Sequence, residues 1–395
     1  MRIIHTADWH LGQTFFDYDR TTEHICFLDW LRLQIRRLRA DVLLVAGDVF
    51  DSSNPGAEAQ RLFYLFLREV TGENPGLQVI IIAGNHDSAA RLEAPNPLLE
   101  CLHVSVRGLV RRTQTGAIDY RHLIVPLRRG GCCLAVPYLR QGDYPEATTY
   151  AQGVKNLYAT LYGMVRGGRG PILAMGHLQA AGSEVSESDV SERTFAGGLE
   201  CVSSEAFDRG ITYTALGHLH RAQRVAGREN VRYAGAPLPM SFAERNYARG
   251  VTYISIDGEK VTQQRLVFEA PVKLWSIPSE ASSLEAALGA IAALPEGEAD
   301  AASPYVEVKI LLTEPEPSLR HRLEEALRTK AVRLARIEKA LPGVGAEAGG
   351  AAVASLQGVH PMEIAEKAYR RRFAGLEMPP GMRTLLEEVI REVEL

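Results

Sequence analysis

The chain has no long apolar segment and no cysteine motif. Its longest aliphatic runs, such as "VIIIA" at 79–83, are far too short to cross a bilayer, and no long apolar stretch follows Met1. Its five cysteines form no CxxC pair and are odd in number, which argues against a disulfide framework or a zinc ribbon. These absences predict a cytoplasmic protein without a membrane anchor.

Excess positive charge is also missing. The chain has 44 Lys and Arg against 48 Asp and Glu, a formal net charge of −4, which argues against a generally cationic nucleic-acid binder but leaves local basic patches open. A central segment is nevertheless dense in arginine. Its candidate phosphate contacts are Arg107, Arg111, Arg112, Arg121, Arg128, Arg129 and Arg140. For any single one of them, a solvated surface position is the simpler interpretation.

The length of 395 residues predicts two or three domains. Aliphatic strands at 2–7, 40–48 and 77–87 alternate with helical patterns at 21–40 and 56–70, as in α/β proteins whose strands are buried on both faces.

The middle of the chain continues this pattern with strands at 170–179 and 210–220. The segments 230–238, 250–258 and 260–268 follow, with turn residues between them, and we expect them to form an antiparallel run that covers one side of the core.

Composition shifts near Pro271. Strand and helix patterns at 271–340 predict a small separate α/β domain, and the Gly- and Ala-rich segment 341–359 predicts a linker. The segment 360–395 carries two amphipathic helical patterns. We therefore expect four parts, with residues 1–270 as the first.

Potential metal ligands stand at the ends of five aliphatic strands. They are Asp8, His10, Asp48, Asn85, His86, Asp87, His177, His218 and His220. Because sites form outside the carboxyl ends of strands in α/β sheets, we expect these side chains to converge. A mixture of carboxylate, amide and imidazole groups is better suited to a divalent ion such as manganese than to a zinc site of the thiolate type.

Each strand end alone has a plainer interpretation. The "GD" at 47–48 is typical of a turn, "GNHD" at 84–87 is typical of a helix N-cap, and a single histidine such as His177 is more often structural. Five such ends in this order predict a binuclear metal site.

The ordered pattern "DWH … GDVFD … GNHD … GHLQ … GHLH" resembles the calcineurin-like metallophosphoesterase superfamily. The resemblance implies an α/β core, a two-sheet sandwich flanked by helices. It implies one metal ion held by Asp8, His10, Asp48 and His220, and a second held by Asp48, Asn85, His177 and His218. It also implies that His86 faces the phosphate and the leaving group, and that Asp87 orients His86.

Three further segments, "MRIIHTADWHLGQ", "AVPYLR" and "YAGAPLPMSFAERNYARGV", resemble the SbcD family of bacterial nuclease subunits. This resemblance implies a nuclease with two Mn²⁺ ions, or Mg²⁺, acting on DNA in an ATP-dependent repair complex. It implies 3′-to-5′ exonuclease action on duplex ends and endonuclease action on single strands or hairpins. It also implies a capping domain at 271–340, and C-terminal helices at 360–395 that dock on an SbcC-type ATPase subunit.

The same resemblance implies a homodimer, for which the helices at 56–70 and 88–101 are the expected surface. Asp51 departs from the pattern, because archaeal and eukaryotic relatives usually have a second histidine there, and an ionised carboxylate cannot serve as a cationic or donor group. We keep Asp51 as a candidate catalytic residue. Two alternatives stay open: a stand-alone phosphodiesterase for small molecules, and a non-catalytic scaffold.

Overall fold

The computed structural model describes residues 1–183, 201–312, 316–340, 362, 365–366, 369–370 and 377–393, the last seven by backbone alone. The chain divides into two compact units. The first comprises Met1–Trp275, Ala299–Val306 and Ala331–Ala335, and the second Ser276–Glu298, Glu307–Lys330 and Arg336–Leu395.

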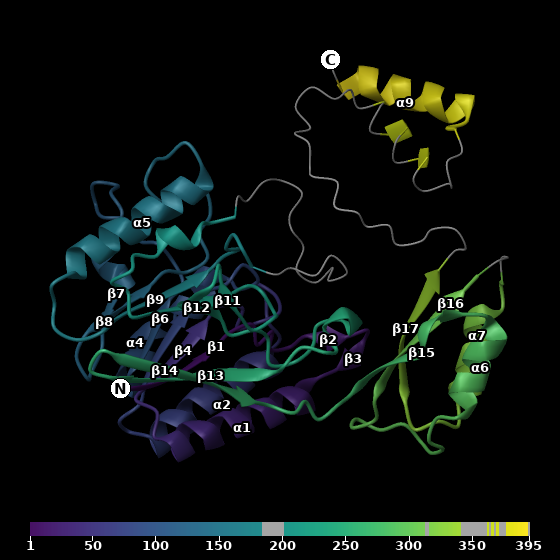
Figure 1. The fold of residues 1–395 in the computed structure, drawn as a ribbon, viewed down its shortest axis with the longest axis horizontal. Helices are drawn as coiled ribbons and strands as arrows, with labels where there is room; N and C mark the ends of the chain where they lie inside the picture. The colour runs from purple at the N-terminus through teal and green to yellow at the C-terminus, as the bar shows by residue number, and fades with distance from the viewer. Residues whose placement is uncertain are drawn as a thin grey trace. The chain divides into compact units, whose positions relative to one another are not determined.

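Two six-stranded sheets form the first unit (Figure 1). The first sheet has the order β14 (Lys260–Val267), β13 (Gly250–Asp257), β1 (Arg2–Thr6), β4 (Val42–Ala46), β5 (Gln78–Ile82) and β6 (Val104–Arg107). The second has the order β11 (Gln223–Val225), β12 (Arg228–Tyr233), β10 (Tyr213–Gly217), β9 (Ile172–His177), β8 (Cys132–Ala135) and β7 (Ile124–Pro126). A short hairpin pairs β2 (Thr14–Phe15) with β3 (Tyr18–Asp19).

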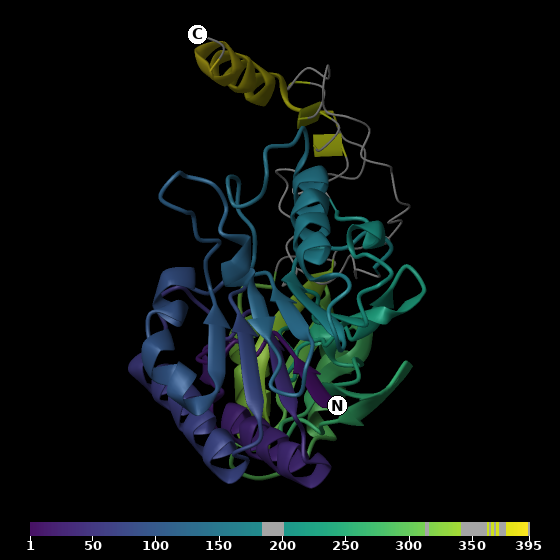
Figure 2. The ribbon, with the colours of Figure 1, turned by 90° about the vertical axis from the view of Figure 1, so that its left-hand side faces the viewer.

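Helices cover the outer faces of both sheets (Figures 1 and 2). The long ones are α1 (Thr21–Leu38) and α2 (Ala57–Glu73) on the first sheet and α5 (Tyr150–Val165) on the second. Region 88–101, expected to be helical, is split into α3 (Ala89–Glu93), α4 (Asn96–Leu99) and the 3₁₀ turn η1 (Glu100–Leu102). Prolines interrupt this region, because proline lacks a donor N–H. Three other short turns are η2 (Tyr120–Leu123), η3 (Ser204–Ala206) and η4 (Phe242–Glu244).

Alternate residues of one strand belong to different cores. In β4, Leu44 and Ala46 pack between the two sheets, whereas Leu43 and Val45 pack on the side of α1 and α2. Helix α1 buries Phe27 in the same layer. The strands therefore read as continuous aliphatic runs because both of their faces are buried. The predicted sandwich flanked by helices is confirmed.

One predicted pairing is wrong. Strands β13 and β14 do form an antiparallel pair beside β1, but β12 pairs parallel with β10 in the other sheet. The cause is a tight hairpin at Ala226 and Gly227, both with positive φ, which folds β12 back on β11. The segment 230–238 thus ends the second sheet, and the chain crosses to the first sheet after it.

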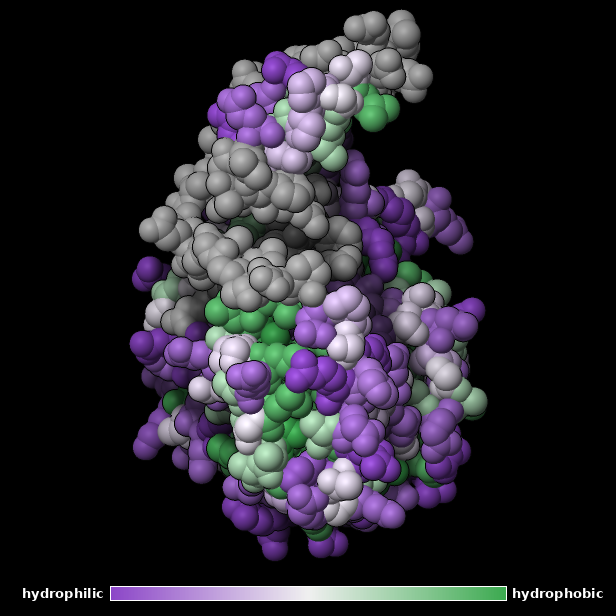
Figure 3. Space-filling view, turned by 90° about the vertical axis from the view of Figure 1, so that its right-hand side faces the viewer, coloured by the Kyte–Doolittle hydropathy of each residue, from purple (hydrophilic) through white to green (hydrophobic). Residues whose placement is uncertain are grey.

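The second unit holds most of a three-stranded sheet and two helices. The sheet order is β15 (Leu274–Ser282), β16 (Tyr305–Leu311) and β17 (Arg333–Ala340), and the helices are α6 (Leu284–Ala292) and α7 (Leu319–Leu327). Figure 3 shows, on the face it views, an apolar strip bordered by hydrophilic residues. Glu285 is the single charged residue of α6, so this helix has little hydrophilic surface of its own.

The last described helix is α9 (Pro380–Val393). The linker expected at 341–359 and most of the segment 360–379 lie outside the described residues. Among the described residues, no helix combines the length and apolar character needed to cross a lipid bilayer.

Candidate metal centre

The five strand ends singled out in the sequence meet at one edge of the sandwich. Strands β1, β4 and β5 run parallel in the first sheet, as do β9 and β10 in the second, and β4 lies against both β9 and β10. Their carboxyl ends bring together Asp8, His10, Asp48, Asn85, His86, His177, His218 and His220.

The backbone at these ends adopts conformations that most residues avoid. Asp8, His10, Asp48 and His218 all have positive φ, between 47° and 103°. Such strain collects at functional sites, where the surrounding structure enforces it. The loops at these strand ends also pack closely. Gly84 is required there because a Cβ at this position would collide with the Asp48 carboxylate.

One group of side chains surrounds His177. Its Nε2 lies 2.9 Å from Oδ1 of Asn85 and 3.2 Å from Oδ2 of Asp48. Nδ1 of His218 lies 3.0 Å from the same Asn85 oxygen. One amide oxygen and two imidazoles thus converge beside one carboxylate.

A second group surrounds His10. Its Nε2 lies 3.8 Å from Oδ2 of Asp48, and its ring centroid lies 5.3 Å from that of His220. Asp8 adds a further carboxylate, which accepts the backbone N–H of His218 at 2.9 Å through Oδ1. Asp48 is the residue that both groups share.

Several polar atoms here are buried without a hydrogen-bond partner. They include Oδ2 of Asp8 and Nε2 of His10, although both residues are at most 3% exposed. Burial of an unpaired polar atom is costly, so such atoms are expected to face a ligand. Carboxylate, amide and imidazole donors of this kind fit a divalent cation.

The electrostatics also favour a cation. Burial alone would lower the pKa of His177, but Asp48 and Asp8 raise it to about 9, which shows that the two carboxylates stabilise positive charge at this point. Burial, with His177 and His220 nearby, lowers the pKa of His218 to about 3. That imidazole therefore stays neutral at physiological pH, the form that binds metals.

His86 lies at the rim of the centre and is exposed. Its Nδ1 is 3.0 Å from the backbone carbonyl oxygen of Asp51, and its ring centroid is 4.9 Å from that of His10. The side chain of Asp51 lies against His10 instead, with Oδ1 3.2 Å from Nδ1. Asp51 therefore contacts two histidines of the centre, one through its backbone and one through its carboxylate.

The role expected for Asp87 needs correction. Its buried carboxylate accepts hydrogen bonds from the backbone N–H groups of Gly84, Val49 and Phe50, at 2.9–3.2 Å, and among the described contacts none comes from the His86 ring. Asp87 ties the loop after β4 to the loop after β5. It therefore fixes the two loops that carry Asp48 and Asn85, and the carbonyl of Asp51 contacts the His86 ring.

The candidate arginines divide by position. Arg129 pairs with Asp41 at 2.9 Å, directly before β4, and so lies at the opposite end of that strand from Asp48. Arg140 stacks on Tyr138, with 5.6 Å from its guanidinium carbon to the ring centroid, and the Tyr138 ring is 6.2 Å from that of His177. Arg140 therefore lies near the candidate metal centre, next to the ring that neighbours His177, whereas Arg129 lies at the far end of β4.

Glu244 was assigned no role from the sequence, yet it contacts the centre. Oε1 of Glu244 lies 2.9 Å from Nδ1 of His220, and Oε2 lies 2.8 Å from Nη2 of Arg249. Burial opposes ionisation of this carboxyl, but His220 and Arg249 lower its pKa to about 2. No spacing rule could have linked residues 220, 244 and 249 before the fold was known.

Comparison with known proteins identifies the family. Residues 1–222 match calcineurin-like phosphoesterases, and residues 271–373 match the type 5 capsule protein repressor C-terminal domain. The SbcD component of nuclease SbcCD from Rhodobacter capsulatus is 38% identical over 85% of this chain and 86% of its own length. The chain belongs to the SbcD family.

Other SbcD proteins are also similar to this chain. The SbcD component of nuclease SbcCD from Escherichia coli K12 is 34% identical over 66% of each chain, and that from Bacillus subtilis is 33% identical over 70% of this chain and 72% of its own. Every candidate ligand lies within the 1–222 match to calcineurin-like phosphoesterases, whereas Glu244 and Arg249 lie beyond it.

Proposed function

We propose that the chain is the nuclease subunit of an ATP-dependent DNA repair complex and hydrolyses DNA phosphodiester bonds at a binuclear metal centre. The observation that carries this proposal is the convergence of buried ligand groups from five strand ends, with Oδ2 of Asp8 and Nε2 of His10 left unpaired. The relatives are named as components of nuclease SbcCD, which supports the choice of a nuclease.

One metal ion would be held by Asp8, His10, Asp48 and His220, and the other by Asp48, Asn85, His177 and His218. The mixture of oxygen and imidazole donors suits Mn²⁺, with Mg²⁺ as the alternative. Paired divalent ions, when bound, neutralise charge on a phosphate and lower the pKa of a water molecule. The ligand groups carry two carboxylates, so the ions leave a net positive field for an anionic substrate.

His86 would face the phosphate without holding a metal ion. Nδ1–H of His86 would donate a hydrogen bond to the Asp51 carbonyl oxygen, so Nε2 is the ring nitrogen available to the substrate. A protonated Nε2 is suited to donate a proton to the departing oxygen of the DNA strand. Asp51 would position both His10 and His86, and it stays a candidate catalytic residue.

The assembly would be a cytoplasmic homodimer bound to an SbcC-type ATPase subunit. Residues 271–340 would form the cap, 341–359 a linker, and 360–395 the helices that dock on the ATPase. The match of residues 271–373 to a second family model supports a separate region after 270. The substrates would be duplex ends, cut 3′ to 5′, and single-stranded or hairpin DNA, cut internally.

The test is cleavage of end-labelled duplex, hairpin and single-stranded DNA with Mn²⁺, Mg²⁺ or EDTA. We expect metal-dependent cutting that EDTA abolishes, and a loss of about 10²–10⁴-fold in His86→Ala, the usual range for a general acid. Cleavage of cyclic nucleotides without any DNA cutting, even with the ATPase subunit added, would favour a small-molecule phosphodiesterase instead.

A further inference from the structure

We propose that Glu244 is a positioning residue for the metal centre, which holds His220 in the tautomer that binds a metal ion and is itself held by Arg249. This inference rests on the proposed function, because it assigns a role toward the ion that His220 would bind. It adds a residue that lies 24 positions beyond His220 in the chain.

Glu244 and His220 form a buried contact at hydrogen-bond distance. Oε1 of Glu244 lies 2.9 Å from Nδ1 of His220, and the two side chains are 0% and 6% exposed. An ionised carboxylate can only accept a hydrogen bond, so Nδ1 of His220 must carry the proton. The lone pair of the neutral ring then lies on Nε2, which is the atom that would coordinate a metal ion.

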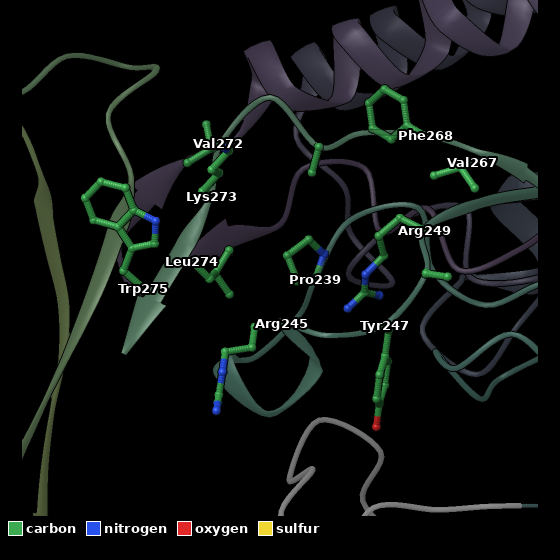
Figure 4. A pocket seen from close by; sticks show the side chains of 12 residues that line it. Pro239, Arg245, Tyr247, Arg249, Val267, Phe268, Val272, Lys273, Leu274 and Trp275 are labelled. Atoms are coloured by element: carbon green, nitrogen blue, oxygen red, sulfur yellow. The ribbon is translucent and has the colours of Figure 1, made fainter. Parts of the chain in front are cut away.

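The second oxygen of Glu244 fixes the carboxylate in place. Oε2 accepts hydrogen bonds from Nη2 of Arg249 at 2.8 Å and from the backbone N–H of Met240 at 3.2 Å. Arg249 in turn donates to the backbone oxygens of Glu244, Ala236 and Leu238. Figure 4 shows its guanidinium between Pro239 and Tyr247 in the wall of a pocket. The carboxylate therefore has no freedom to turn away from His220.

His177 shows a weaker form of the same arrangement. Its Nδ1 lies 2.9 Å from the backbone carbonyl oxygen of Ala46, a neutral acceptor. A carboxylate behind the ring raises the basicity of the imidazole more than a neutral carbonyl does, because it stabilises positive charge on the ring. Glu244 should therefore increase the affinity of the ion that His220 holds.

The variant Glu244→Gln separates this role from packing. Both donors on the Oε2 side, Arg249 and Met240, require an oxygen, so the amide oxygen of glutamine takes that position. The amide NH₂ then faces Nδ1 of His220 and can only donate, which moves the ring proton to Nε2. The side chain keeps its size, but His220 now presents an N–H to the metal ion.

The matched control is Glu93→Gln. Glu93 is likewise a buried carboxylate, 4% exposed, that pairs with Arg111 and lies 3.4 Å from Nε2 of His122, but it contacts no candidate ligand. The experiment titrates metal-free full-length protein with Mn²⁺ by calorimetry, without DNA. It also assigns the His220 tautomer by ¹⁵N NMR and records thermal unfolding in EDTA.

We expect Nδ1–H for His220 in the wild type and Nε2–H in Glu244→Gln, with Mn²⁺ bound about 10–100-fold more weakly by the variant, the usual cost of losing such a partner. Glu93→Gln should keep the wild-type affinity. Wild-type affinity in Glu244→Gln, or Nε2–H in the wild type, would overturn the inference and leave the proposed function standing. If Glu244→Gln fails to fold, the wild-type tautomer still decides. A wild type that binds no divalent ion would overturn the proposed function itself.

Discussion

Oδ2 of Asp48 lies 3.2 Å from Nε2 of His177, and this contact joins the two sheets of the sandwich. Asp48 follows β4 in the first sheet, and His177 ends β9 in the second. The candidate metal centre therefore forms only when the two sheets pack in the correct register. An ion bound there would stabilise the sheet interface as well as act on a substrate, because binding to the folded state alone raises stability.

Asp48→Asn tests this coupling, since it removes a negative charge from both ligand groups and keeps the side-chain size. With Mn²⁺ at about 100 times its Kd, the wild type should gain about 2.7 kcal/mol of unfolding free energy. Asp48→Asn should lose this gain, measured as the Mn²⁺-dependent shift of Tm against EDTA.

Asp41→Asn is the control, because Asp41 lies at the other end of β4, where its carboxylate accepts the backbone N–H of Arg2 at 2.7 Å. It should lower stability by about 1–3 kcal/mol, the cost of disturbing a buried hydrogen bond, yet keep the Mn²⁺ shift. An Asp48→Asn protein that keeps the full shift would show that the ion is not held there.

Gly84→Ala should damage the same centre through sterics alone. The added Cβ would collide with the Asp48 carboxylate and its backbone nitrogen, so the loop after β5 must move. We expect loss of the Mn²⁺ shift together with lower stability. The comparison is Gly72→Ala in α2, where a Cβ meets no atom within 4 Å and removes backbone freedom from the unfolded chain. That variant should be more stable by about 0.5–1 kcal/mol in urea unfolding.

The sequence predicted the parts of the centre that depend on local order. Aliphatic strands that end in Gly-Asp, Gly-Asn-His-Asp and Gly-His place Asp48, Asn85 and His177 at the carboxyl ends of strands, whichever sheet each strand joins. The sequence could not predict which sheet each strand joins, so β12 was wrongly placed in one antiparallel run with β13 and β14. Its pairing with β10 depends on the two-residue hairpin with β11 and on burial of Val231 and Tyr233 in the core on the α5 side, which are tertiary effects.

The roles of supporting residues were harder to predict. The family resemblance implied that Asp87 orients His86, yet its carboxylate points to backbone N–H groups of two loops. Three hydrogen bonds from buried backbone N–H groups stabilise a buried carboxylate more than a single contact with an exposed imidazole would. Glu244 reaches His220 across 24 residues, and only the closed fold brings these two together.

Acid should weaken the fold in part through Glu93. Burial opposes its ionisation, but His122, the backbone N–H groups of Leu109 and Gly108, and Arg111 lower its pKa to about 2 from an ordinary 4.5. The folded-state pKa lies below the unfolded one, so this stabilisation is present above pH 4.5 and is lost as pH falls toward 2.

Glu93→Gln should therefore be less stable than the wild type at neutral pH, and the two should converge in acid. Urea unfolding across this pH range, in EDTA so that metal binding does not contribute, measures the difference. If the free energies of unfolding of the two proteins differed by the same amount at every pH, Glu93 would have the same pKa in the folded and unfolded states.

Leu98→Glu tests the proposed homodimer. Leu98 lies in α4, within the expected dimer surface, and is 76% exposed. If α2 and the 88–101 region form the dimer surface, a buried carboxylate there would oppose association. We expect the wild type to elute as a dimer at micromolar concentration and Leu98→Glu to elute as a monomer with unchanged Tm in dilute solution.

Leu33→Glu provides the matched control, because Leu33 is also exposed, at 48%, but lies on α1, outside the expected surface. It should remain dimeric. Cleavage of a small phosphodiester should survive in both variants, since neither residue contacts the candidate ligands, whereas cutting of duplex ends should fall in Leu98→Glu if both protomers grip one DNA. A wild type that is monomeric at every concentration would remove the dimer from the proposal and leave the metal centre untouched.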